Sequence, residues 1–142
     1  MAINSKHSKA QANAAEELRA QIAAQSGFAQ EVLASSLTAV LTAQAALINR
    51  FMQAQGLWES DNTGEKLALM HSELSEALEA DRKGLEAEHI VGFTGVEEEL
   101  ADCIIRILDF AHHHDLRLGE AISAKVFYNL TRPHKHDKAY DK

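Results

Sequence analysis

Apolar residues recur at steps of three, four and seven along most of the chain, which is the spacing of one face of an α-helix. The clearest row extends from Leu33 to Phe51, and Gly56 follows it. Residues 14–24 permit a helix but are only weakly amphipathic. The pattern predicts one long helix, preceded by an N-terminal extension, residues 1–30, that is partly helical or flexible.

Two further helices follow from the same periodicity. One extends from about Glu65 to Arg82, and the polar residues 61–64 can cap its start. The other extends from about Val96 to His113. Thr94 and Glu97 form a capping-box pattern at its first turn.

A fourth helix is predicted from near Gly119 to about Leu130, before Pro133. No strand pattern competes with these helices. We therefore expect an all-α fold with a four-helix-bundle-like core. One domain, residues 31–136, would hold this core, and residues 137–142 would form a charged tail.

The formal net charge of −7 argues against a nucleic-acid binder, which would present a basic face. The single cysteine, Cys103, lies within an apolar pattern and is expected to be a small core residue in a reducing compartment. The first residues have no apolar signal core, and no run of 18 consecutive apolar residues exists. We expect a cytoplasmic protein with no membrane span.

Two pairs of acids stand out on consecutive predicted helices. Glu73 and Glu76 form one pair, and Glu99 and Asp102 form the other. Residues three apart on a helix point the same way, so antiparallel packing could bring four carboxylates together. Such a cluster is favourable only if it binds cations or takes up protons. Oxygen ligands suit Mg²⁺, with Mn²⁺ as a possible substitute, which indicates phosphate or pyrophosphate chemistry.

The same acids also fit a solvated helix surface, on which Asp102 and Arg106 would form an ordinary ion pair. Glu97 and Glu98 fit first-turn acids that favour the helix dipole. A di-iron bundle would need Glu-x-x-His on two helices, and the nearest approach, Asp109 to His112, has no matching partner. His112 to His114 are expected to be exposed imidazoles at a helix end.

Lys125, Asn129 and Arg132 share one face of the last predicted helix. Lysine offers a point charge to phosphate, arginine a bidentate fork and asparagine a neutral amide. The alternative is a cationic helix end that offsets the macrodipole.

Three segments carry a resemblance to a known family: E73-L-S-E76, E99-L-A-D102 and K125-x-x-x-N129-x-x-R132-P. In this order and at these separations they resemble the MazG-like branch of the all-α nucleoside triphosphate pyrophosphohydrolases. The wider wording "TGEKLALMHSELSEALEADRKG" and "VEEELADCIIRILDFA" is similar to that family too. The resemblance covers about Leu57 to His136.

The resemblance implies an oligomer, which would be a homodimer or a homotetramer. It implies hydrolysis of a nucleoside or deoxynucleoside triphosphate to the monophosphate and pyrophosphate. The matching metal ligands are Glu73, Glu76, Glu99 and Asp102, and the matching phosphate ligands are Lys125 and Asn129, with Arg132 a weaker transfer.

Roles within that reaction are expectations. Glu76 is expected to orient the attacking water and Lys125 to stabilise the leaving pyrophosphate. Trp58 could stack on a base or seal the rim of the bundle, and His71 could face the pocket or be solvated. A catalytically inactive nucleotide- or metal-binding bundle, or a purely structural bundle, is the alternative.

Overall fold

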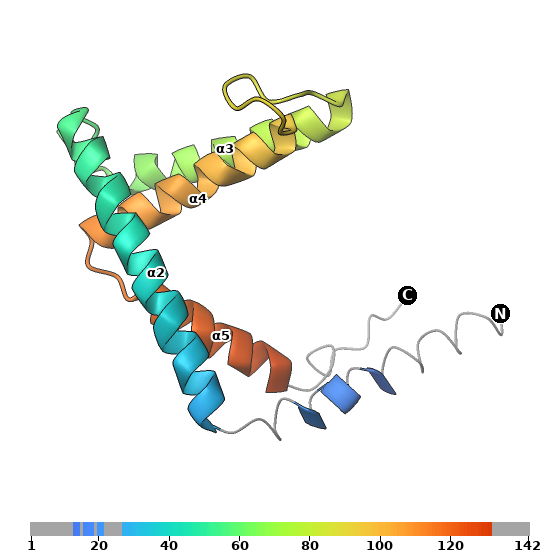
Figure 1. Cartoon of the computed structure of the whole chain (residues 1–142). Helices are drawn as coiled ribbons and strands as arrows, with labels where there is room; N and C mark the ends of the chain where they lie inside the picture. The colour runs from blue at the N-terminus through green and yellow to red at the C-terminus, as the bar shows by residue number, and fades with distance from the viewer. Residues whose placement is uncertain (1–12, 15, 19, 22–26, 132–142) are drawn as a thin grey trace, which may run out of the picture. The chain divides into compact units, whose positions relative to one another are not determined.

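The computed structural model describes residues 13–131 except 15, 19 and 22–26. Throughout this part of the chain the regular elements are helices, and the only β-type pairing is one bridge between Glu86 and Thr94 (Figure 1). The labelled helices are α2 (Gly27–Ala54), α3 (Thr63–Lys83), α4 (Gly95–His113) and α5 (Leu118–Thr131). The predicted all-α class is confirmed.

The described residues fall into two compact units. One unit is Ala39–Leu118 and holds the end of α2 with all of α3 and α4. The other combines the described residues up to Thr38 with those from Gly119 to Thr131. The predicted boundaries at residues 30 and 136 remain predictions.

Both ends of α3 follow from local chemistry. The side chain of Asn62 accepts a hydrogen bond from the backbone N–H of Glu65, which caps the first turn. At the other end Gly84 adopts φ 61° and ψ 44°, the left-handed conformation that glycine reaches without strain. The helix therefore begins and ends close to the predicted positions.

The first turn of α4 is held by the predicted capping box. The Thr94 side chain accepts from the Glu97 backbone, and the Glu97 carboxylate accepts from the Thr94 backbone at 2.8 Å. These contacts lower the pKa of Glu97, mainly through the backbone hydrogen bond from Thr94. The start of α4 is thus fixed by two residues that lie three positions apart in the sequence.

Helices α3 and α4 run antiparallel, side by side along most of their length (Figure 1). Small side chains are buried along this pair, and they let the two backbones approach closely. They are Ala77 and Ala80 of α3 and Cys103 and Ala111 of α4. Cys103 is buried, as predicted. This packing decides which polar side chains of the two helices meet.

Within the other unit, α5 starts against α2. A Cβ atom at Gly119 would lie 2.7 Å from the Cα of Thr38, so only glycine allows this approach. Gly119 is buried. The contact places the start of α5 directly on the α2 backbone.

Much of α2 exposes apolar side chains. Leu33, Val40 and Leu47, spaced by seven, are 67%, 66% and 63% exposed. Within the described part of the chain, Glu31–Ala54 is one helix long and apolar enough to cross a membrane, with a mean hydropathy of 1.5. A core helix of a soluble protein satisfies the same two criteria.

Candidate metal centre

Three of the four predicted carboxylates meet between α3 and α4. Glu73 and Glu76 come from α3 and Glu99 from α4, and one oxygen from each lies within 4.8 Å of the others. Antiparallel packing produces this convergence because each pair lies on the face that its helix turns to its neighbour. We call Glu73, Glu76 and Glu99 the acidic triad.

The triad passes from the interior to the surface. Glu73 is buried, Glu99 is half-buried and Glu76 is exposed. A cation held here would have protein on one side and an open side for water or another ligand. Carboxylate oxygens are the donors that hard divalent ions prefer, so the residues present could hold Mg²⁺ or Mn²⁺.

The fourth predicted ligand, Asp102, lies one turn after Glu99 on α4. It is outside the acidic triad, although its charge interacts with Glu73. Partial burial raises the pKa of Asp102, and the negative charge of Glu73 adds to this effect, while Arg106 opposes it. Asp102 therefore lies within electrostatic range of the triad.

The pKa of Glu99 is raised as well. Burial is the largest cause, followed by the negative charges of Glu76 and Glu73. Both shifts have the sign expected of partly buried carboxylates that repel one another. The cluster therefore favours either protons or a bound cation.

One cation of the protein already contacts the triad. The Nε of Arg106 lies 2.5 Å from Oε1 of Glu73, forming a hydrogen-bonded ion pair between α4 and α3. The alternative of a solvated helix surface paired Arg106 with Asp102. The structure pairs Arg106 with Glu73 instead, because antiparallel packing brings α3 within reach.

A pocket of about 260 Å³ adjoins this ion pair. Asp102 and Arg106 line it, together with Lys66 and Asp109. The remaining walls are apolar or aromatic: Met52, Leu57, Trp58, Leu69, Met70, Ile105 and Phe110. Arg106 beside the triad, Lys66 near Trp58 and the apolar walls suit a ligand that carries negative charge and a flat apolar group.

Asp109 organises one end of this pocket. It is buried, and its carboxylate accepts hydrogen bonds from Asn49 Nδ2 at 2.7 Å and from the indole N–H of Trp58. Asn49 is also buried, and it accepts a bond from Gln53 at 2.8 Å. The end of α2, the loop after it and the end of α4 are joined by this network. Sequence reasoning missed Asn49, and it considered Asp109 only as an iron ligand.

The ring of Trp58 has a near neighbour of its own. It stacks on His113 with centroids 3.5 Å apart and planes 6° apart, and Lys66 Nζ lies 4.6 Å from its centroid. His114 contacts Trp58 edge-on and Phe110 at 4.3 Å. The expectation that these imidazoles are exposed is therefore wrong for His113 and His114, which are half-buried against aromatic rings.

The other predicted ligand-binding residues are distributed more widely. His71 is exposed on α3 and does not line the pocket. Lys125 and Asn129 are exposed on α5, in the other unit, where Lys125 Nζ lies 4.7 Å from the Tyr128 ring centroid. Arg132 lies outside the described residues.

Glu98 has a role that its first-turn position did not predict. It is buried, and its carboxylate accepts from the backbone N–H groups of Glu88 and His89 at 2.7 and 3.0 Å. These bonds lower its pKa, the one from Glu88 most strongly. Glu98 thus fastens the loop before α4, whereas Glu99 turns to the triad.

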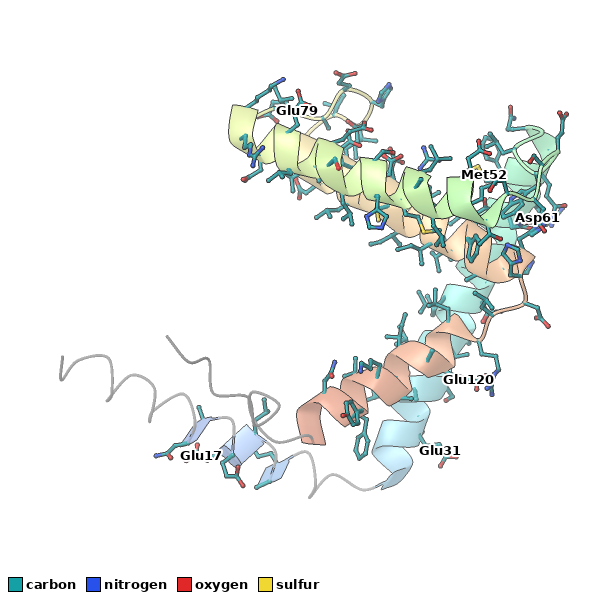
Figure 2. The ribbon with its side chains drawn as sticks, turned by 180° about the vertical axis from the view of Figure 1, so that it is seen from behind. Glu17, Glu31, Met52, Asp61, Glu79 and Glu120 are labelled. Carbon is teal, nitrogen blue, oxygen red and sulfur yellow. The ribbon has the colours of Figure 1, made fainter. Side chains whose placement is uncertain are left out.

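Figure 2 labels residues at both ends of the α3–α4 pair. Met52 and Asp61 are labelled at one end, near the pocket residues, and Glu79 lies toward the other end of α3. Glu79 is exposed and paired with Lys83, and this contact lowers its pKa. An ordinary surface acid and two members of the acidic triad therefore occur on α3.

Comparisons with protein-family models, curated proteins and solved structures found no match to this chain.

Proposed function

We propose that this chain is a Mg²⁺-dependent nucleoside triphosphate pyrophosphohydrolase of the MazG-like kind. The observation that supports this most is the convergence of Glu73, Glu76 and Glu99 beside a pocket with an apolar wall. Hard oxygen ligands next to space for a flat group suit a metal-bound nucleotide. The products would be a monophosphate and pyrophosphate.

The residues would divide the work as follows. Glu73, Glu76, Glu99 and Asp102 would hold the cation. Bound Mg²⁺ would neutralise the triphosphate and lower the pKa of a water nucleophile. Glu76, which is exposed at the rim of the triad, would orient that water and accept its proton.

The nucleoside would occupy the pocket beside Asp102 and Arg106. Phe110 and Trp58 line this pocket and offer aromatic surface to a base. The stacking of Trp58 on His113 supports an edge or rim contact over insertion between two rings. His71 stays a candidate for the outer part of the site.

Lys125, Asn129 and Arg132 would contact the phosphates. Lys125 would stabilise negative charge on the leaving pyrophosphate, and Asn129 would donate its amide to a phosphate oxygen. This assignment depends on the resemblance and on the spacing of the three residues in the sequence.

We further propose a homodimer or homotetramer in the cytoplasm. The exposed row of Leu33, Val40 and Leu47 supports this, because an apolar residue at every seventh position is typical of helices that pack on one another. A mass from light scattering at twice or four times the chain mass would support it. Recovery of the protein in the membrane fraction would contradict it.

The test is product analysis over a panel of nucleoside and deoxynucleoside triphosphates, with Mg²⁺ or with EDTA. We expect monophosphate and pyrophosphate with Mg²⁺ only. Glu76→Gln should abolish turnover, while Glu79→Gln, an exposed acid on the same helix, should not. Diphosphate and phosphate as products would contradict the reaction class. No product from a folded protein would favour the inactive-bundle alternative.

A further inference from the structure

Arg106 contacts the acidic triad and also lines the adjoining pocket. Its guanidinium donates to the buried Glu73 carboxylate, and the same side chain lines the adjoining pocket. The Arg106 side chain is 40% exposed, whereas that of Glu73 is only 6% exposed. The arginine can therefore move, while its partner is fixed in the core.

The charges around Glu73 explain why Arg106 pairs with it. Four carboxylates, those of Glu73, Glu76, Glu99 and Asp102, interact with one another. Arg106 supplies a positive charge that arginine cannot lose by deprotonation. It thus provides part of the neutralisation that a divalent ion would provide.

A divalent ion on the triad would change this balance. The ion would share Glu73 with the guanidinium, and two positive groups a few ångströms apart repel each other. The pocket offers the arginine another place, since Arg106 already lines it together with Lys66. Planar guanidinium groups bind phosphate oxygens in bidentate fashion.

We propose that Arg106 is a ligand-binding residue with two alternative partners: it pairs with Glu73 before a metal ion binds, and it binds the anionic phosphates of the ligand once the metal ion is in place. This inference rests on the proposed function, because it takes the ligand to be a polyphosphate. It gives Arg106 opposite effects on the two ligands. Arg106 opposes metal binding and favours polyphosphate binding.

The experiment measures two affinities on the full chain and its Arg106→Gln variant. Free Mn²⁺ is quantified by electron paramagnetic resonance, and inorganic triphosphate is titrated calorimetrically in saturating Mg²⁺. We expect Mn²⁺ to bind about fivefold more tightly to Arg106→Gln, because a repelling charge is removed. Triphosphate should bind about tenfold more weakly, because a charged hydrogen-bond donor is lost.

Two variants provide the controls. Arg106→Lys keeps the charge and should retain the Mn²⁺ affinity of the unaltered chain. Arg82→Gln removes the same charge from an exposed position at the end of α3, and neither affinity should change. Circular dichroism and melting temperature show that each variant is folded, and Arg106→Lys still tests the proposal if Arg106→Gln is not.

The outcomes separate this inference from the proposed function. Weaker binding of both ligands to Arg106→Gln would overturn it, since a group that only orients Glu73 supports both. Unchanged affinities would overturn it too. Opposite changes in a chain without turnover would uphold the role of Arg106 and reject the enzyme. Turnover by the unaltered chain, together with weaker binding of both ligands to Arg106→Gln, would support the enzyme and reject the proposed role of Arg106. A chain that binds no Mn²⁺ would overturn the metal centre and this inference with it.

Discussion

Trp58 donates its indole N–H to Asp109, with both carboxylate oxygens 3.0 Å from the nitrogen. The two residues are 51 positions apart, and the bond fastens the loop after α2 to the last turns of α4. Asn49 donates to the same carboxylate from the end of α2. A buried acid thus holds three segments together at the apolar end of the pocket.

Asp109→Ala should destabilise the fold. It leaves the buried amide of Asn49 and the indole N–H of Trp58 without their acceptor, which costs about 2–4 kcal/mol in free energy of unfolding. Asp109→Asn keeps an acceptor oxygen and should cost about half as much. Urea denaturation checks both values. Equal stability of Asp109→Ala and the unaltered chain would show that water replaces this network.

Repulsion among the carboxylates of the acidic triad should destabilise the folded protein when no metal ion is bound. Burial raises the pKa of Glu99, with Glu76 and Glu73 adding to the shift, so its ionised form opposes folding. In EDTA at neutral pH, Glu99→Gln should therefore raise the melting temperature, and solvent screening should keep the increase to a few degrees. It should also abolish the increase that Mg²⁺ produces. A lower melting temperature in EDTA would mean that Glu99 has a structural partner.

The same shifts predict how the metal-free stability depends on pH. Because the folded pKa values of Glu99 and Asp102 lie above the unfolded ones, the folded chain holds more protons at intermediate pH. Their stabilising contribution is complete below the unfolded pKa and is lost as pH rises through the raised folded pKa. Denaturation in EDTA at several pH values from about 4 to 7 measures this loss.

The double variant Glu99→Gln, Asp102→Asn is the control for that pH series. The difference in unfolding free energy between the double variant and the unaltered chain should increase in favour of the variant as pH rises. Mg²⁺ should cancel the difference at neutral pH, because the metal replaces the protons. A difference that stays constant with pH would contradict the shifted pKa values.

Gly119 offers a test of the other unit. Gly119→Ala places a Cβ 2.7 Å from the Thr38 Cα, so the backbones must separate, at a cost of about 1–3 kcal/mol. Gly64→Ala is a matched control, since its Cβ would meet only Asn62 Oδ1 at 3.5 Å in a helix that favours alanine. The melting temperature should therefore fall for Gly119→Ala, and it should rise or stay unchanged for Gly64→Ala.

The helices were predictable because their signals are local. Apolar periodicity, the Thr94 to Glu97 capping box and Gly84 each act within a few residues, and the helix ends lie close to the predicted ones. The acidic triad was also predictable, since three-residue spacing places each acid pair on one face. Antiparallel packing of neighbouring helices was the only further assumption.

The rest of the site depends on long-range contacts that periodicity does not encode. Arg106 pairs with Glu73 across 33 positions, and Asn49 reaches Asp109 across 60. On an isolated helix, any of these four side chains could equally have faced solvent. Likewise, nothing in the run of three histidines distinguishes His113, which stacks on Trp58, from the exposed His112.

Glu98 separates loop stability from metal binding. Its carboxylate accepts hydrogen bonds from the backbone N–H groups of Glu88 and His89, so Glu98→Ala should lower the free energy of unfolding. Hydrogen exchange should increase at those two amides. Because Glu98 lies outside the acidic triad, Mn²⁺ affinity should stay within about twofold of the unaltered chain. A large loss of Mn²⁺ affinity would show that the loop, and not only the α3–α4 pair, positions Glu99.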